Sequence, residues 1–355
     1  MDIPLKNWKL IIRADANHSI GIGHVMRCLA LAQAWTKHGG KALLVGKIES
    51  TALKDRLCAF NIEFIELEES YPQSANDSKI LLNIAANVGK PSWIVLDGYF
   101  LDTAYQNEIL KRFHNTLVID DYHHLDIYSA TMILNQNFGS EKIEYRTTTK
   151  TTVLAGAKYA LLRNEFREPN IIQKKQTAAN QIKLLISLGG ADTNNTSLLV
   201  LKALNILPNN LAITLIIGPE NKHTQSLTQY ADKSSHKIEI LSNVSNMAEL
   251  IAQNDIIISA GGSSCWEICC IGKPLVIIIT ADNQKMLSNE LAKAGAAINL
   301  GENHEISEEY ISKNIKKLIL SPQKITKLSN KSKTIIDGHG VARVINAMTG
   351  TRGLQ

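Results

Sequence analysis

The sequence lacks the features that mark several common classes of protein. Its five cysteines show no paired C-x-x-C spacing, so neither a zinc site nor a disulfide framework is indicated and a reducing compartment is expected. Only 8 of the 355 residues are proline, and 45% are hydrophobic against 20% charged, which excludes a largely disordered chain. No run approaches about 18 consecutive apolar residues, and no basic N-terminal segment precedes an apolar one. We therefore expect a folded cytoplasmic protein without stable membrane insertion.

Two common nucleotide-binding motifs are also missing. No G-x-x-x-x-G-K-[ST] occurs, which excludes a P-loop. Met26 stands where the third glycine of a dinucleotide-binding G-x-G-x-x-G would fall, which argues against a nicotinamide dehydrogenase. The net charge of +5 is mild. Lysines recur at helical spacing over 313–333 without interleaved aromatics, so this segment is interpreted as a solvated helix face and no nucleic-acid partner is expected.

Short apolar segments alternate with segments of helical period along the whole chain. The expected strands of the first half are 8–15, 41–46, 64–67, 92–98, 116–120 and 131–135, with helices over 24–38 and 101–113. The pattern restarts with expected strands at 183–190, 211–218, 237–242, 255–262, 274–280 and 296–301. Runs that are apolar on both faces and separated by helices are typical of parallel sheets covered on both sides. The sequence thus predicts an α/β protein with two doubly wound, Rossmann-like domains.

The polar stretch between the two halves sets the expected domain limits. Residues 1–166 would form the N-terminal domain, 167–181 a linker, 182–335 the C-terminal domain, and 336–355 a C-terminal helix and tail. Ligands of doubly wound sheets bind outside the carboxyl ends of the strands. We therefore expect the functional residues in a cleft that both domains face.

Three glycine-rich turns fall at expected strand-to-helix junctions, over 21–24, 188–195 and 260–267. Glycine lets the backbone approach a ligand closely, and the helix that follows offers free N–H groups. Each turn could also be a plain tight turn of small residues. Two of them lie in the second domain and are followed by hydroxyl or amide side chains, which favours a pyrophosphate site there.

Several polar side chains would lie at the same strand ends. Glu267 follows Ser264 within the first helical turn, where it could cap its own helix or, as the glycine turn favours, bind a ribose. His24 would begin a helix, whose positive end favours a neutral imidazole able to take a proton. Tyr99 is either a site or a packing residue, and Asp120-Asp121 either reach the cleft or cap the loop that follows.

The motifs together resemble a known family. They are "RADANHSIGIGHVMRCLALA", "VLDGY", "VIDD", "GAKYALLRNEF", "LISLGGAD" and "AGGSSCWEICCIGKPLVIII", followed by Asn283-Gln284. This set is similar to that of the UDP-sugar hydrolases of pseudaminic acid biosynthesis, which act on UDP-2,4-diacetamido-2,4,6-trideoxy-β-L-altropyranose. Those enzymes have the GT-B fold and are related to the transferase that adds N-acetylglucosamine to a lipid-linked peptidoglycan precursor. The likeness spans residues 9–301.

This resemblance implies a reaction and a set of site residues. Water would attack the anomeric carbon with inversion and release UDP, with no metal and no cofactor, in a protein expected to be a monomer. His24 would activate the water, with Tyr99 and Asn283 as catalytic residues near the sugar, and Glu267 would bind the ribose. The substrate and UDP contacts would lie on Gly21, Gly23, Arg163, Gly189, Gly190, Asp192, Gly262, Ser263, Ser264, Glu267 and Gln284. The alternatives are a GT-B glycosyltransferase, a UDP-sugar epimerase and a nucleotide-sugar-binding regulator.

Overall fold

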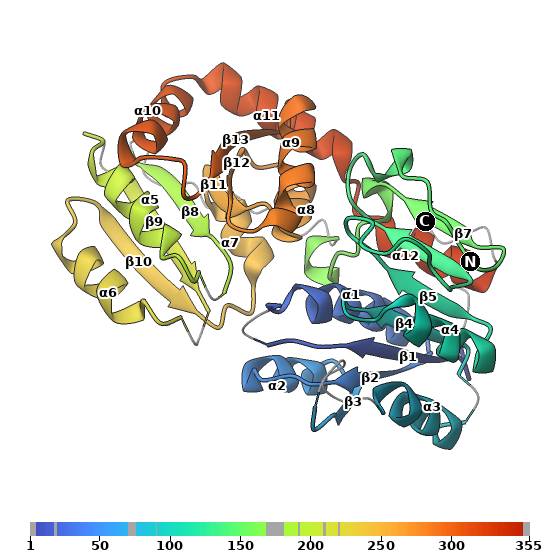
Figure 1. The fold of residues 1–355 in the computed structure, drawn as a ribbon. Coiled ribbons are helices and arrows are strands. Elements are labelled where there is room, and N and C mark those ends of the chain that lie inside the picture. The colour runs from blue at the N-terminus through green and yellow to red at the C-terminus, as the bar shows by residue number, and fades with distance from the viewer. Residues whose placement is uncertain are drawn as a thin grey trace. The chain divides into compact units, whose positions relative to one another are not determined.

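The computed structural model describes residues 5–17, 20–69, 76–89, 91–167, 181–190, 192–208, 211–218 and 221–350. The chain forms two units, one made of Met1–Asn164 with Gly338–Gln355 and the other of Glu165–Asp337. In Figure 1 the first unit runs from blue to green and includes the red C-terminal helix α12. Apart from its two end residues, the expected linker over 167–181 lies outside the described residues.

The first unit is built on seven parallel strands in the order β3-β2-β1-β4-β5-β6-β7. Six of them match the expected strands, whereas the seventh has its first two residues exposed at the sheet edge and lacks the apolar run of a central strand. The strands are β1 (Lys9–Ala14), β2 (Lys41–Gly46), β3 (Glu63–Glu66), β4 (Trp93–Asp97), β5 (Thr116–Ile119), β6 (Met132–Asn135) and β7 (Thr152–Ala155).

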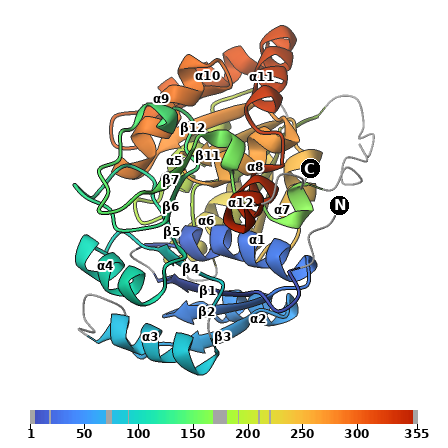
Figure 2. The same ribbon diagram turned by 90° about the vertical axis from the view of Figure 1, so that its right-hand side faces the viewer.

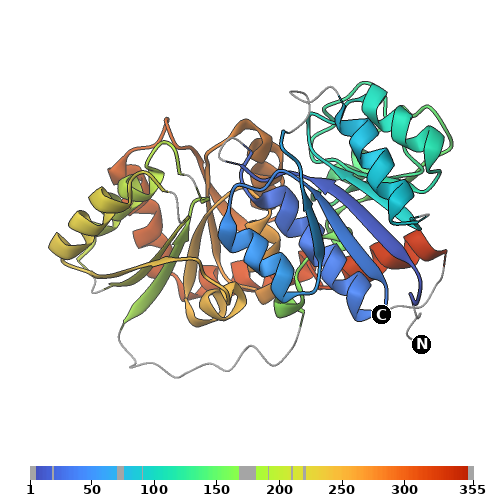
Figure 3. The same ribbon diagram turned by 90° about the horizontal axis from the view of Figure 1, so that it is seen from below.

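Helices cover both faces of this sheet. One face carries α1 (Gly23–Lys37), α2 (Thr51–Ala59) and α12 (Gly340–Thr349), and the other carries α3 (Asp77–Asn87) and α4 (Thr103–Arg112). Figure 2 shows α1 and α12 side by side, and Figure 3 shows the blue strands between the dark blue helix and the cyan helices. Because α1 packs against both the sheet and α12, its alanines and leucines are buried on nearly all sides.

The second unit repeats the plan with six parallel strands in the order β10-β9-β8-β11-β12-β13. All six match expected strands: β8 (Ile182–Ser187), β9 (Leu211–Ile217), β10 (Lys237–Ser242), β11 (Ile256–Ala260), β12 (Leu275–Ile279) and β13 (Ala297–Glu302). The helices are α5 (Thr196–Asn205), α6 (Thr224–Lys233), α7 (Met247–Gln253), α8 (Ser264–Ile271), α9 (Lys285–Lys293), α10 (Glu308–Ile319) and α11 (Pro322–Ile335). The lysine-rich stretch forms parts of α10 and α11 and its lysines are exposed, as expected for a solvated face.

In each unit the first strand along the chain lies in the interior of the sheet, and this strand order positions the candidate site. In the first unit β1 lies between β2 and β4, and in the second β8 lies between β9 and β11. The connections therefore leave in opposite directions from β1 and β4, and likewise from β8 and β11, and the carboxyl ends of such strands are where doubly wound sheets bind their ligands. Among the helices in the described segments, none combines the length and apolarity needed to cross a bilayer.

A buried ion cluster fixes the end of β1. Arg13 is fully buried, and its guanidinium pairs with Asp15 at 2.5 Å and with Asp77 at 2.6 Å. Tyr105 Oη donates to Asp77 at 2.6 Å. Burial alone would lower the pKa of Arg13, but its hydrogen bonds to the two carboxylates outweigh burial and raise it. The strand end that leads toward His24 is therefore held from the α3 and α4 side of the sheet.

Candidate active site

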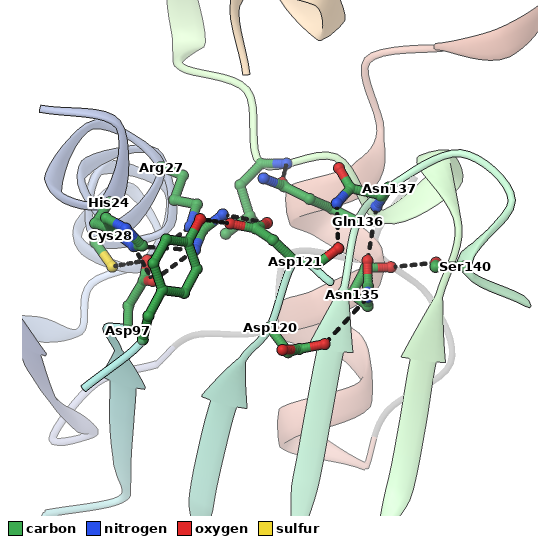
Figure 4. A network of polar contacts seen from close by, with 12 residues as sticks. His24, Arg27, Cys28, Asp97, Asp120, Asp121, Asn135, Gln136, Asn137 and Ser140 are labelled. Carbon is green, nitrogen blue, oxygen red and sulfur yellow. Dashed lines mark hydrogen bonds and ion pairs between the residues drawn. The ribbon is translucent and has the colours of Figure 1, made fainter. Parts of the chain in front are cut away.

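His24, Asp97 and Tyr99 meet at the point where the strand order of the first unit reverses. His24 is the second residue of α1, Asp97 is the last residue of β4, and Tyr99 follows two residues later. His24 Nδ1 lies 2.6 Å from Asp97 Oδ1, and the rings of His24 and Tyr99 meet edge to face with centroids 4.6 Å apart. Figure 4 shows the His24 side chain turned toward Asp97. The structure thus brings together two residues that the sequence singles out, around a carboxylate that it does not.

The short contact with Asp97 decides which nitrogen of His24 carries the hydrogen. Asp97 is fully buried; burial alone would raise the pKa of its carboxyl group, but Arg27 and His24 lower it well below its usual range. An ionised carboxylate only accepts hydrogen bonds, so His24 Nδ1 is the donor. In the neutral ring the lone pair then lies on Nε2, which has no hydrogen-bond partner among the described residues. His24 is therefore oriented as a base.

Arg27 binds the same carboxylate from the next turn of α1. Its Nε donates to Asp97 Oδ2 at 2.7 Å and one terminal nitrogen donates to Oδ1 at 2.6 Å. The other terminal nitrogen donates to Asp121 Oδ1 at 2.6 Å, and Tyr99 Oη donates to Asp121 Oδ2 at 2.5 Å. This network, drawn in part in Figure 4, connects α1, the end of β4 and the loop after β5.

Aromatic rings extend from His24 along this edge of the sheet. Tyr99, which packs on His24, also packs edge-on against Tyr122 with centroids 5.0 Å apart and against His124 at 5.6 Å. Tyr122 is 42% exposed. Tyr99 is thus held by the rings packed against it and by the hydrogen bond of its hydroxyl, and the exposed side chain of Tyr122 lies beside it.

The adjacent residues Asp120 and Asp121 have different burial and different hydrogen-bond partners. Asp120 is fully buried, and hydrogen bonds to it counter the effect of burial and lower its pKa to about 2. It accepts these bonds from His124 Nδ1 at 2.9 Å, Tyr128 Oη at 2.9 Å, Tyr145 Oη at 2.6 Å and the His123 backbone N–H at 2.9 Å. Asp120 therefore stabilises its own loop, as the capping alternative expects, whereas Asp121 contacts Arg27 and Tyr99.

The glycine turns of the second unit border open space. Gly189 follows β8 with a φ of +93°, and Gly262 follows β11. A Cβ added at either position would have no atom within 4 Å. Gly190 is different, because a Cβ on Gly218 would lie 2.3 Å from its carbonyl oxygen. The two open turns leave room for a ligand group against the backbone, and Gly190 holds the first turn against β9.

Two residues expected to contact UDP support these turns in the structure. Asp192 accepts from the backbone N–H groups of Thr196 and Ser197 at 2.8 and 2.9 Å, so its carboxylate satisfies the start of α5. Gln284 Oε1 accepts from the N–H of Gly261 at 3.2 Å and of Thr280 at 2.9 Å. It therefore braces the loops after β11 and β12 against each other.

The remaining expected site residues have these positions. Ser263 and Ser264 begin α8, which has no side-chain hydrogen bond at its N-cap, and Glu267 is in its first turn. Asn283 is exposed in a 3-10 turn, η5 (Asp282–Gln284), of the second unit. Arg163 is buried in the first unit. Gly21 and Gly23 flank the residue before α1, and Gly21 has a φ of +72° and open space around its Cβ position.

Sequence reasoning missed Asp97 and Arg27. Both carried a usable signal: Arg27 lies three residues after His24, which puts both on one helix face, and Asp97 ends an expected strand just before Gly98-Tyr99. Neither signal shows that the two elements meet. Only the pairing of β1 with β4 brings Asp97 to the start of α1.

Comparison with known proteins defines the fold. Residues 184–345 match the glycosyltransferase family 28 C-terminal domain. The crystal structure of MurG from Acinetobacter baumannii is similar with a TM-score of 0.67, 15% identity, and coverage of 97% of this chain and 100% of that one. Spinosyn rhamnosyltransferase SpnG complexed with thymidine diphosphate gives a TM-score of 0.69, 16% identity, and coverage of 96% and 99%. The chain has the GT-B fold.

Sequence relatives narrow the resemblance. The UDP-2,4-diacetamido-2,4,6-trideoxy-β-L-altropyranose hydrolase of Campylobacter jejuni is 24% identical over 81% of this chain and 97% of its own, which confirms the predicted family resemblance. The spore coat polysaccharide biosynthesis protein SpsG of Bacillus subtilis is 22% identical over 94% and 95%. An uncharacterised protein of Methanocaldococcus jannaschii is 27% identical over 80% of this chain, which spans only 58% of that relative. Fold and relatives together indicate an enzyme.

The environment of Asp120 predicts a loss of stability in acid. The pKa of Asp120 in the folded protein is about 2, below the value of about 3.9 for an unfolded aspartate, so its contribution is complete above about pH 4 and is lost as the pH falls toward 2. Between pH 4 and pH 2 we expect the unfolding free energy of the wild type to fall by about 2 kcal/mol more than that of Asp120→Asn, which has no carboxylate to protonate. Urea denaturation at several pH values measures it. The exposed Asp126 of the same loop provides the control Asp126→Asn, and parallel pH profiles for wild type and Asp120→Asn would contradict the prediction.

Proposed function

We propose that the protein hydrolyses a UDP-activated diacetamido-trideoxyhexose to the free sugar and UDP, as a step in nonulosonic (pseudaminic) acid biosynthesis. The observation that carries this proposal is the His24–Asp97 pair, in which a buried carboxylate orients the ring and leaves Nε2 without a partner among the described residues. The printed name of the Campylobacter relative supports the choice of substrate. The open glycine turns of the second unit support a nucleotide site there.

The chemistry needs one base and a cradle for the leaving group. His24 Nε2 would take a proton from water as the water oxygen bonds to the anomeric carbon on the face opposite UDP. The bond from that carbon to the phosphate oxygen breaks, and UDP leaves with the electron pair, so the sugar is released with inversion. Ordinary glycosidases need a carboxylic acid to protonate a poor leaving group. UDP is already a good one, so backbone N–H groups near Gly189 and Gly262 would suffice to stabilise its charge.

A GT-B glycosyltransferase is the second candidate, and it is favoured by the family 28 match and by the structural neighbours. The same His24–Asp97 pair could deprotonate an acceptor hydroxyl instead of water. A UDP-sugar epimerase would share the nucleotide site but would release no free sugar in stoichiometric amount. The acceptor, not the base, therefore separates the hydrolase from the transferase, and a UDP-linked product identifies the epimerase.

Incubation with the UDP-diacetamido sugar alone tests the proposed function. We expect the anomeric NMR signal of UDP-2,4-diacetamido-2,4,6-trideoxy-β-L-altropyranose to be replaced by that of the free sugar without any acceptor. A new UDP-linked isomer would favour the epimerase. Unchanged substrate would contradict hydrolysis and would favour a transferase or a binding protein. A panel of UDP-sugars that differ at C2, C4 and C5 then defines the hexose.

Replacement of His24 tests its role as the base. His24→Asn and His24→Phe should lower kcat by about 10²-fold or more, because the proton acceptor is lost. UDP affinity measured by calorimetry should stay nearly unchanged, since the proposed nucleotide contacts lie in the second unit. The exposed His114, which precedes β5 at its other end, gives the control His114→Asn. Near-normal turnover of His24→Phe would move the role of base to Tyr99 or Asp121.

Replacement of Glu267 tests the ribose contact. Glu267→Ala should weaken UDP binding by roughly 1.5–3 kcal/mol, the usual cost of losing hydrogen bonds to a charged acceptor. The carboxylate of Glu309 is fully exposed, and Glu309→Ala is the matched control, expected to leave UDP affinity unchanged. Calorimetric titration with UDP measures both variants. Equal affinities for wild type and Glu267→Ala would assign Glu267 to its helix alone.

A further inference from the structure

Arg27 lies where it can control the charge of the proposed base. Its guanidinium shares Asp97 Oδ1 with His24, since both the Arg27 terminal nitrogen and His24 Nδ1 lie 2.6 Å from that oxygen. The same terminal nitrogen lies 3.1 Å from Nδ1 itself. The positive charge of Arg27 is therefore as close to the imidazole as the negative charge of Asp97 is, within about half an ångström.

The two neighbours of His24 act on its proton in opposite directions. A buried carboxylate in contact with Nδ1 stabilises the imidazolium form, which is useless as a base. A guanidinium in contact with the same ring disfavours that form. The helix N-terminus at His24 adds to the effect of Arg27. Without Arg27, His24 would be the one side chain of the described segments still ion-paired with Asp97.

Asp121 limits what Arg27 can do. It binds the other terminal nitrogen of Arg27 at 2.6 Å and is 13% exposed, so its negative charge also acts at short range. With Asp97 it makes two carboxylates against one guanidinium. The balance of these three charges sets how readily His24 takes a second proton.

The other described side chains that contact Asp97 or the His24 ring are uncharged. Cys28 Sγ donates to Asp97 Oδ2 at 3.2 Å, and burial raises the pKa of its thiol, so it stays neutral. Tyr99 donates its hydroxyl to Asp121, and beyond it lie Tyr122 and His124, which contact Tyr99 and not His24. Burial also raises the pKa of Tyr122. The described residues around the ring thus leave the Arg27, Asp97 and Asp121 charges in control.

Each of the three guanidinium nitrogens of Arg27 donates to a carboxylate within the network. Its Nε and both terminal nitrogens bind Asp97 or Asp121, and its side chain is only 6% exposed. A guanidinium already paired with two carboxylates has its positive charge balanced before a phosphate could bind. Arg27 is therefore better placed to act on His24 than on a UDP phosphate.

We propose that Arg27 is a positioning residue that keeps His24 able to accept a proton near neutral pH, and that Asp121 opposes it. The proposal rests on the proposed function, in which His24 is the base. It yields a signed expectation: loss of the positive charge moves the protonation of His24 to higher pH, and loss of the Asp121 charge moves it to lower pH. If Arg27 and Asp121 only maintained the fold, their replacement would not shift the protonation of His24 in opposite directions.

The test follows the His24 ring protons by NMR as a function of pH in the ligand-free protein, with His24→Asn to assign the signal. We expect Arg27→Gln to raise the midpoint by about one pH unit or more, and Asp121→Asn to lower it, as for a unit charge at this range. Arg27→Lys, which keeps the charge, should move it less than Arg27→Gln. Lys54→Gln removes one positive charge from an ion pair elsewhere in the same unit and should leave the midpoint unchanged.

Equal midpoints, or shifts of the same sign in Arg27→Gln and Asp121→Asn, would overturn the proposal. If Arg27→Gln does not fold, the direction of the Asp121→Asn shift decides alone. The acid limb of kcat/KM should follow the NMR midpoints in the variants that turn over. Because the titration needs no substrate, absence of hydrolysis in the wild type would refute the proposed function without affecting the test of the charge balance.

Discussion

The buried carboxylate of Asp97 has to find a donor for each of its oxygens, and the first unit is organised around that requirement. His24 and Arg27 come from one face of α1, and Cys28 adds a thiol hydrogen bond. A buried unpaired carboxylate would cost several kilocalories per mole. The start of α1 is therefore tied to the end of β4, and the same pairing orients the imidazole ring of His24.

The first unit contains a second arginine held between two carboxylates. Comparison of the Arg13 and Arg27 clusters shows how they differ in exposure and in the side chains that they include. Arg13 pairs with Asp15 and Asp77 on the other face of the sheet, and the cluster is closed by Tyr105. It includes no histidine, and each of its charged side chains is completely buried. The Arg27 cluster includes Asp121 with a partly exposed carboxylate and His24, whose Nε2 has no hydrogen-bond partner among the described residues. The same arrangement of one arginine and two carboxylates thus fixes a strand end in one place and contacts a histidine ring in the other.

The two units differ in how they would treat a nucleotide sugar. The first gathers charge and aromatic rings at the strand ends, which suits proton transfer and contact with a sugar. The second offers glycine turns with open space in front of the backbone, while Asp192 and Gln284 use their oxygens to brace those turns. Backbone N–H groups stabilise a departing pyrophosphate without a competing charge. A hydrolase and a transferase could share all of this, because they differ only in which hydroxyl reaches the base.

The sequence by itself determined the architecture. Of the thirteen strands in the described residues, twelve are predicted by short apolar runs that can be recognised without knowledge of the rest of the chain, and the glycine turns and His24 directly follow such runs. The strand β7 escaped because an exposed edge strand needs no continuous apolar pattern. Only the tertiary structure decided that Arg27 and His24 share the carboxylate of Asp97, that Asp120 binds within its own loop while Asp121 binds Arg27, and that Asp192 caps a helix. The shared carboxylate depends on contacts between residues about 70 positions apart, and such contacts arise from the order in which strands pair, which no local pattern encodes. The bonds of Asp120 and Asp192 are made within their own loops, where the sequence shows the acidic residue but not which backbone or hydroxyl group turns toward it.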